Sequence, residues 1–165
     1  MRTSDISIRE ATGADAAAIA AIYNHAVLTT TATFDLEPET AAARRRALKS
    51  DATRLCLVAE VDGRVVGWAS LSRWSSRRAY ERTVEASIYV AAETRRAGVG
   101  LALAEAALAA APALDVHAVI AQVCAENAAG LALADRLGFA RVGTLREVGH
   151  KFGRVLDVVV SERLV

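Results

Sequence analysis

The sequence predicts an α/β (α+β) fold, with a mixed central β-sheet and helices on both faces, in the order βααβββαβαββ. Short apolar runs typical of strands alternate with longer runs whose apolar residues have helical spacing. Asp62-Gly63, between two strand-like runs, is the strongest hairpin signal in the chain. The 165 residues are 53% hydrophobic, so we expect one packed core and a single domain over residues 1–165.

The first 50 residues are expected to form one strand and two helices. Ile6 and Ile8 alternate with polar neighbours, as in a short strand. Thr12 and Asp15 form a capping-box pattern, which predicts that a helix begins there. A Thr-rich polar stretch over 28–38 then separates this helix from a second one, expected over about 39–49.

The rest of the chain is expected to hold six strands and two helices. Strands are predicted over 55–61, 65–71, 83–90, 116–123, 142–145 and 156–160. One helix should begin at Gly100 and end near Pro112. Asn127 should cap another helix, which ends at Gly138.

Composition and charge exclude several classes of function. Twenty basic residues balance nineteen acidic ones, and the net charge of +1 favours neither nucleic acid nor an anionic membrane as a partner. No segment reaches the roughly 20 apolar residues of a membrane span. Cys56 and Cys124 lie in apolar runs, and His25 and His117 have no partners at metal-ligand spacing. We therefore expect a cytoplasmic protein without a metal.

Residues 95–100, with the pattern R-x-x-G-x-G, are a candidate phosphate cradle between a strand and a helix. Gly98 and Gly100 would let the backbone approach an anion, and the helix start would direct N–H groups at it. Arg95 and Arg96 add charge-assisted donors. Leu103 stands where a dinucleotide fingerprint needs a small residue, and no Lys completes a P-loop. The loop alone is equally consistent with a glycine-rich turn that starts a helix.

The neighbouring motifs resemble the GNAT N-acetyltransferase superfamily. The R-x-x-G-x-G loop is followed by a strand, by Glu126-Asn127-Ala128-Ala129 and by Leu137-Gly138-Phe139. Nearly the whole chain is similar to the phosphinothricin and methionine sulfone (sulfoximine) acetyltransferase branch. The segments that carry this similarity are 22–24, 31–35, 67–70, 83–85, 87–90 and 143–154.

The resemblance implies an acetyl-CoA-dependent N-acetyltransferase that forms a homodimer. The amine of a small amino-acid-like acceptor would attack the thioester directly in a ternary complex. The strand before the loop would carry a bulge that frees backbone N–H groups, with the Val90 N–H donating to the thioester carbonyl. The residues expected to contact acetyl-CoA are Ile88, Tyr89, Val90, Arg95, Arg96, Ala97, Gly98, Val99, Gly100, Leu101 and Asn127.

The resemblance, through the T-V-E pattern of residues 83–85, implies that Glu85 is the general base, acting through a water. An amino-acid ammonium has a pKa near ~8 and must lose a proton before it attacks. The apolar neighbours Val84 and Ala86 should raise the pKa of Glu85 in the useful direction. The alternative interpretation is a solvent-facing strand Glu, and the run 87–90 is also consistent with an ordinary core strand.

The acceptor pocket is expected to be lined by aromatic and polar side chains, with arginines facing a carboxylate. The residues assigned to it are Phe34, Trp74, Ser75, Arg77, Arg78, Tyr80, Thr83, Glu85, Lys151 and Arg154. Arg77 and Arg78 could instead be a solvated loop. Val155 stands where the branch usually has Trp, which weakens a pocket or interface contact there.

Ala134 departs from the family pattern, in which Tyr or His protonates the leaving thiolate. Either Tyr89 or His150 supplies that proton, or the thiolate leaves unaided. Two other functions stay open. One is acetylation of another amine (a polyamine, an aminoglycoside or a peptide N-terminus), although the Arg-rich 73–82 loop disfavours a polycation. The other is a non-catalytic acyl-CoA sensor, which Ala134 favours and Glu85 disfavours.

Overall fold

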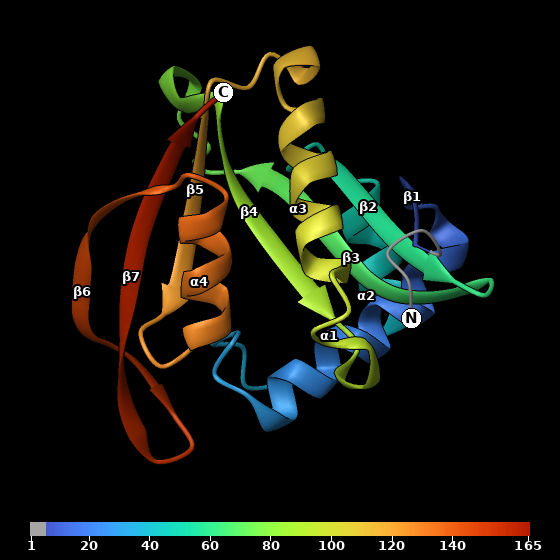
Figure 1. Ribbon diagram of the computed structural model, residues 1–165, viewed down its shortest axis with the longest axis horizontal. Helices are drawn as coiled ribbons and strands as arrows, with labels where there is room; N and C mark the ends of the chain where they lie inside the picture. The colour runs from blue at the N-terminus through green and yellow to red at the C-terminus, as the bar shows by residue number, and fades with distance from the viewer. Residues whose placement is uncertain (1–5) are drawn as a thin grey trace.

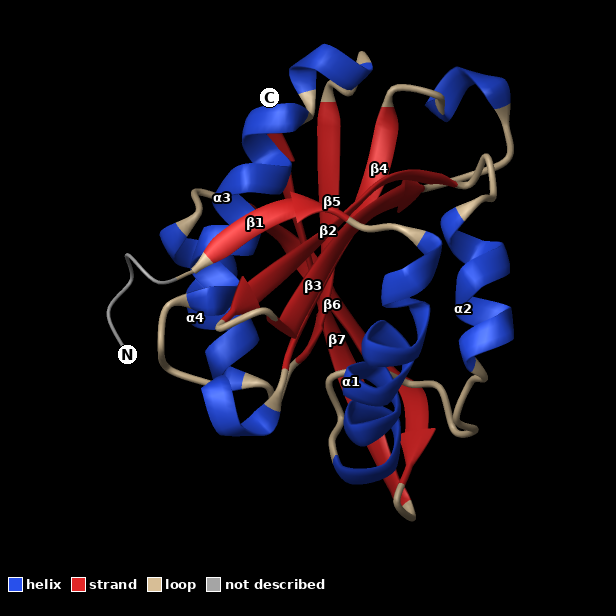
Figure 2. Ribbon diagram, turned by 90° about the vertical axis from the view of Figure 1, so that its right-hand side faces the viewer, coloured by secondary structure: helices blue, strands red, loops and turns tan. Residues whose placement is uncertain are grey.

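The computed structural model describes residues 6–165, which form a seven-stranded mixed sheet in the order β1-β2-β3-β4-β5-β7-β6 (Figure 1). The elements follow one another as predicted, βααβββαβαββ. Their bounds are β1 Ser7–Glu10, α1 Ala16–Thr29, α2 Ala41–Leu48, β2 Thr53–Val61, β3 Arg64–Arg73, β4 Thr83–Val90, α3 Val99–Ala110, β5 Ala118–Cys124, α4 Ala128–Arg136, β6 Ala140–Lys151 and β7 Arg154–Leu164. Helices α1 and α2 cover one face, and α3 and α4 cover the other (Figure 2).

The two faces of the sheet have different cores. Against α3 the core is aliphatic and includes Leu71, Val84 and Leu103. Against α1 it is smaller and contains Ile19 and Trp68. Because side chains alternate along a strand, β2, β3 and β4 contribute to both cores. Within residues 6–165, no helix is both long and apolar enough to cross a membrane.

Local signals determine most element boundaries. Asp62 and Gly63 adopt φ angles of 50° and 72°, as the predicted two-residue hairpin requires. The Thr12–Asp15 capping box is present, although it caps a single 3₁₀ turn that leads into α1. Helix α2 begins after Thr40, not at Glu39, because the Thr40 hydroxyl accepts a hydrogen bond from the Ala43 N–H.

The last two strands are much longer than predicted. β6 has 12 residues and β7 has 11, whereas the sequence pattern indicated only 142–145 and 156–160. The register of β6 shifts between Arg141 and Gly143 and again between Leu145 and Gly149. These irregularities interrupt the alternation by which a strand is recognised in a sequence.

The bulge expected in the strand before the R-x-x-G-x-G loop is absent from the pairing of β4 with β3, so the predicted cause of the free N–H groups is wrong. Their antiparallel register runs unbroken from Gly67↔Val90 to Arg73↔Val84. Instead, β4 leaves its other neighbour: its parallel pairing with β5 ends at Glu85↔Ile120. Figure 1 shows the two strands diverging toward their C-terminal ends. The edge of β4 beyond Glu85 is therefore unpaired on the β5 side.

Arg9 joins the first strand to the first helix. Its guanidinium donates to both carboxylate oxygens of Asp15 at 2.8 Å and to Glu60 at 2.6 Å. Asp15 is only 7% exposed. Its hydrogen bonds with Arg9, and those with Thr12, lower the pKa of the Asp15 carboxyl to about 2.

We expect Asp15→Asn to lower the free energy of unfolding by about 2 kcal/mol at neutral pH. The pKa of Asp15 is lower in the folded state, so its stabilisation is present above about pH 4 and is lost as the pH falls toward 2. Urea titrations of both proteins across this range should therefore converge at low pH. The exposed Asp51→Asn is the control, and an equal loss in both variants would contradict the prediction.

Candidate active site

The open edge of β4 presents a row of backbone donors. The Ala91 N–H donates to the Val66 carbonyl at 2.8 Å, toward β3. Because successive N–H groups in a strand point to opposite sides, those of Ile88 and Val90 point toward β5 beyond Glu85↔Ile120, the last pair of the two strands. The N–H groups expected to be free are therefore available, and the cause is the divergence of two strands.

Glu85 lies at the apex of this divergence, as the last residue of β4 that pairs with β5. Its side chain is half-buried, and Gln122 Nε2 on β5 donates to Glu85 Oε1 at 3.2 Å. Burial raises the pKa of the Glu85 carboxyl, and the hydrogen bond from Gln122 opposes this with a smaller effect. By alternation, Glu85 and Tyr89 point to the α1 face of the sheet.

The N-terminus of α3 lies beside the C-terminal end of β4. Gly98 occupies the N-cap position with a φ of 85°, and no side chain caps the helix. Arg95 and Arg96 are exposed just before it. A Cβ on Gly67 would lie 3.0 Å from Val99, so this glycine lets α3 pack closely against β3. Uncapped N–H groups with two exposed guanidinium groups fit the diphosphate of a coenzyme.

The gap between β4 and β5 beyond Glu85↔Ile120 is called the opening. The other residues assigned to acetyl-CoA lie around it. Val90 Cγ2 is 3.6 Å from the Cβ position of Gly100, so the end of β4 contacts the start of α3. Ala97 and Leu101 are half-buried on either side of that start. Asn127 caps α4 as predicted, since its Oδ1 accepts from the Gly130 N–H at 3.0 Å.

The residues assigned to the acceptor lie in two places. Trp74, Ser75, Arg77, Arg78 and Tyr80 belong to the connection between β3 and β4, and Thr83 begins β4. Within the described chain, neither Arg77 nor Arg78 forms a side-chain ion pair, and both are exposed. These side chains stand two or more residues before Glu85, at the end of β4 that remains paired with β5.

The second group lies at the β6–β7 hairpin. Phe34 is half-buried beside Gly149. Lys151 is 3% exposed and donates to the Thr33 carbonyl at 2.7 Å. Arg154 is ion-paired with Glu126 at 2.7 Å. Lys151 and Arg154 thus hold protein segments together in this structure.

An aromatic cluster surrounds Tyr89 beside Glu85, and its other members, Tyr23 and Trp68, were not assigned to the site from the sequence. Tyr89 stacks on Trp68 at 4.9 Å between ring centroids, and Tyr23 packs edge-on against Tyr89 at 5.0 Å. The Arg44 guanidinium lies 4.6 Å from the Trp68 ring and pairs with Glu39 at 2.6 Å. Tyr23, Trp68 and Tyr89 are far apart in sequence, and only the antiparallel pairing of β3 with β4 places Trp68 opposite Tyr89. Gln122 was also missed, because a single polar residue in a strand gives no signal of its own.

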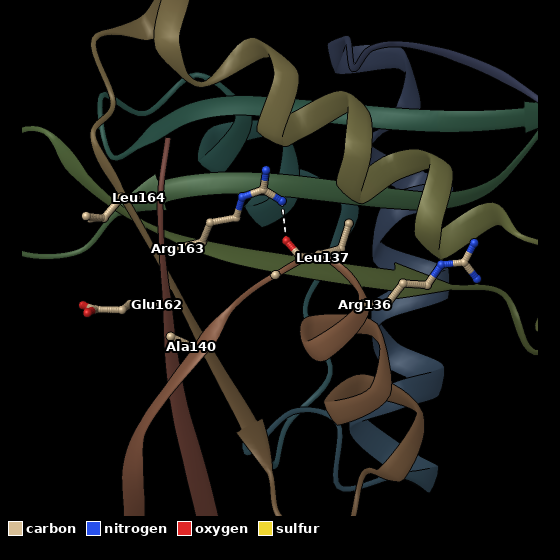
Figure 3. A pocket seen from close by; sticks show the side chains of 7 residues that line it. Arg136, Leu137, Ala140, Glu162, Arg163 and Leu164 are labelled. Carbon is tan, nitrogen blue, oxygen red and sulfur yellow. Dashed lines mark hydrogen bonds between the residues drawn. The ribbon is translucent and has the colours of Figure 1, made fainter.

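A separate hollow of about 520 Å³ lies at the C-terminal end of α4 (Figure 3). It is lined by Arg136, Leu137, Gly138, Ala140, Glu162, Arg163 and Leu164. None of the residues assigned to the site lines it. Its residue Leu164 pairs with Ala118 at the start of β5, whereas the opening lies beyond Ile120.

The uncapped N-terminus of α3 suits the diphosphate of an acyl-CoA, and the half-buried Glu85 carboxylate at the edge of β4 suits a base for an attacking amine, so the site fits an acyl-CoA-dependent acyltransferase. The chain belongs to the acetyltransferase (GNAT) family, whose model matches residues 19–139. It is an N-acetyltransferase, and its co-substrate is acetyl-CoA. Within residues 6–165, no cluster of three or more His, Cys, Asp or Glu side chains could hold a metal.

Three known proteins illustrate the relationship. The chain is 37% identical to an L-methionine sulfoximine/L-methionine sulfone acetyltransferase of Pseudomonas aeruginosa, over 94% of this chain and 92% of that protein. The solved phosphinothricin acetyltransferase of Sinorhizobium meliloti, in complex with acetyl-CoA, matches with a TM-score of 0.91 and 32% identity, over 98% of this chain and 89% of that one. A ribosomal-protein-alanine N-acetyltransferase structure from Brucella melitensis has a TM-score of 0.92 and 38% identity, over 96% and 99%.

Gly98→Ala tests the helix N-terminus as the anion site. A Cβ at a left-handed φ costs roughly 1 kcal/mol and disturbs the turn, so we expect the KM for acetyl-CoA to rise. Gly63→Ala is the matched control, since Gly63 also has a positive φ of 72° but lies in the β2–β3 hairpin, outside the turn before α3. Steady-state kinetics should show the KM change in Gly98→Ala only. Equal behaviour of the two variants would contradict an anion site at α3.

Proposed function

We propose that the protein transfers the acetyl group of acetyl-CoA to the amine of a small amino-acid-like acceptor of the phosphinothricin, methionine sulfone or methionine sulfoximine type. The main support for this proposal is the placement of Glu85, a half-buried carboxylate at the point where β4 separates from β5. The names of the Pseudomonas and Sinorhizobium relatives support this acceptor class.

In the proposed mechanism Glu85 receives the proton of the acceptor ammonium. Because the pKa of Glu85 is raised, the difference between it and the ammonium pKa of ~8 is smaller, which favours this proton transfer. Along β4, Ile88 lies about 10 Å and Val90 about 16 Å from Glu85, at ~3.3 Å per residue. Both distances are much longer than a hydrogen bond, so in this mechanism a water molecule carries the proton from the acceptor amine to Glu85.

The backbone N–H groups of Ile88 and Val90 then stabilise the charge that develops on the carbonyl oxygen. One such donor is typically worth ~3 kcal/mol. The neutral amine nitrogen attacks directly in a ternary complex, a C–N bond forms, the C–S bond breaks, and the sulfur leaves as a thiolate. The nitrogen, positively charged after the attack, releases its second proton to solvent and becomes the amide N–H.

The thiolate leaves without a proton from α4, because Ala134 is a buried core residue. A thiol pKa near ~8.5 makes this leaving group tolerable. Burial raises the pKa of Tyr89 to about 12, so its hydroxyl stays protonated, and it donates to the Ala32 carbonyl.

The acceptor is proposed to bind between Glu85, Phe34 and the connection that carries Trp74, Ser75, Tyr80 and Thr83. The exposed guanidinium groups of Arg77 and Arg78, free of side-chain ion pairs within residues 6–165, suit a carboxylate on the acceptor. Lys151 and Arg154 contribute by fixing the hairpin beside Phe34.

A homodimer through the β6–β7 hairpin is also proposed. Five apolar side chains of this hairpin are exposed, each by 46–62%. They are Val142, Leu145, Val148, Phe152 and Val155. Such a patch on two adjacent strands favours an interface over solvent. A reducing, cytoplasmic location is proposed as well, since Cys56 and Cys124 are both buried free thiols.

The acceptor class is tested by acetyl-CoA turnover with a panel of amines. We expect turnover with methionine sulfone, methionine sulfoximine and phosphinothricin. A second candidate is a peptide N-terminus, favoured by the name of the Brucella relative, and the panel therefore includes an alanine-initiated peptide. Turnover only with the peptide would replace the proposed acceptor, and binding without any turnover would favour an acyl-CoA sensor.

Glu85→Gln should lower kcat by about 10²–10⁴-fold, because the acceptor proton loses its base. In the parent protein, kcat/KM should fall as the pH drops through the raised pKa of Glu85, since protonation removes the base. Gln122→Leu removes the hydrogen bond that favours the carboxylate, so this acid limb should move to higher pH. The exposed Glu105→Gln should match the parent in rate and pH profile. An unchanged acid limb in Gln122→Leu would refute this role for Glu85.

Val155→Asp should convert the dimer to a monomer, because it places a charge in the exposed apolar patch. Sedimentation velocity measures the assembly, and circular dichroism checks the fold. Leu164→Asp is the control, since Leu164 is 63% exposed but lies at the far end of β7. A monomeric parent protein would contradict the homodimer.

A further inference from the structure

The segment 32–35, between α1 and α2, is attached to both neighbouring parts of the fold. On one side the Tyr89 hydroxyl of β4 donates to the Ala32 carbonyl at 3.3 Å. On the other, Lys151 Nζ donates to the Thr33 carbonyl at 2.7 Å, from a position 118 residues later in the chain. The segment therefore bridges the strand that carries Glu85 and the β6–β7 hairpin.

The Lys151 contact is a strong restraint. The side chain is 3% exposed, and burial lowers the pKa of the Lys151 ammonium, an effect that the charge of Asp35 opposes. A buried ammonium is costly unless it is hydrogen-bonded, so its bond to the Thr33 carbonyl is expensive to break. The segment is held in one position next to the hairpin.

Phe34, the residue after this contact, lies directly on the backbone of Gly149. A Cβ built on Gly149 would be 2.1 Å from Phe34 Cε2, and its three nearest atoms all belong to this ring. Ordinary carbon–carbon contact is about 3.5–4.0 Å, so any side chain at 149 would push the ring away by roughly 1.5 Å. The position of Phe34 thus requires glycine for space.

An irregularity in β6 brings Gly149 to this place. The register with β7 shifts between Leu145 and Gly149, and Glu147 within the shift has a left-handed φ of 57°. The Glu147 N–H donates to Asp157 Oδ1 at 2.7 Å, which holds the bulge. Bulges commonly redirect the strand beside a functional site.

We propose that Gly149 determines acceptor specificity. Because Gly149 lacks a Cβ, the Phe34 ring packs against β6, and the position of this ring sets the size of the acceptor pocket. The inference rests on the proposed function, in which Phe34 lines that pocket. Gly149 acts through Phe34 and is a positioning residue.

Gly149→Ala is the test, with Gly143→Ala as the matched control on the same strand, where a Cβ would have nothing within 4 Å. We expect Gly149→Ala to raise the KM for methionine sulfone by about tenfold or more, and to leave the KM for acetyl-CoA within about twofold. Gly143→Ala should change neither constant. In a Phe34→Ala background, adding Gly149→Ala should have no further effect on the acceptor KM, because the displaced ring is gone.

Equal kinetics of Gly149→Ala and Gly143→Ala, or a persistent effect of Gly149→Ala without the Phe34 ring, would overturn the inference. An equal rise in both KM values would indicate general disruption and would overturn it too. If Gly149→Ala does not fold, Phe34→Leu tests the same packing position with Gly149 intact. The Phe34→Leu variant should accept a bulkier amino-acid acceptor. Failure of the parent protein to acetylate any small amine would instead refute the proposed function.

Discussion

The constraint on which the site depends is the early end of the parallel pairing between β4 and β5. The two strands are joined through α3, and a parallel pair requires such a crossover. Gly67 lets α3 pack so closely on β3 that its N-terminus is fixed next to Val90. The separation of β4 from β5 therefore places the strand donors, the Glu85 carboxylate and the uncapped start of α3 next to one another.

The opening also connects the two faces of the sheet. Even-numbered side chains of β4 enter the aliphatic core under α3, whereas Tyr89 enters the aromatic cluster under α1. Because backbone N–H groups lie in the plane of the sheet, donors at the open edge are accessible from both faces. A thioester bound by α3 and an amine near Glu85 would thus meet at the gap.

The sequence predicted the order of elements and the hairpin at Asp62-Gly63, because both follow from local residue patterns. It also predicted the Asn127 cap and the helix that starts at the R-x-x-G-x-G loop, since these lie in short continuous motifs. It missed the extent of β6, where two register shifts break the alternation. It missed Gln122, Arg44 and Gly149, because their contacts join segments that are distant in the chain.

The free N–H groups of β4 show how a structural expectation can hold while its cause differs from the one expected. A bulge exposes donors by adding a residue to one strand, and it would have broken the register with β3. Divergence from β5 exposes them while that register stays intact. The difference has a consequence for rigidity: β4 keeps its full ladder with β3, so its open edge is backed by a complete row of hydrogen bonds. If these donors bind the thioester carbonyl as proposed, they would need little reorganisation when charge develops on its oxygen, which is the condition under which such groups are most effective.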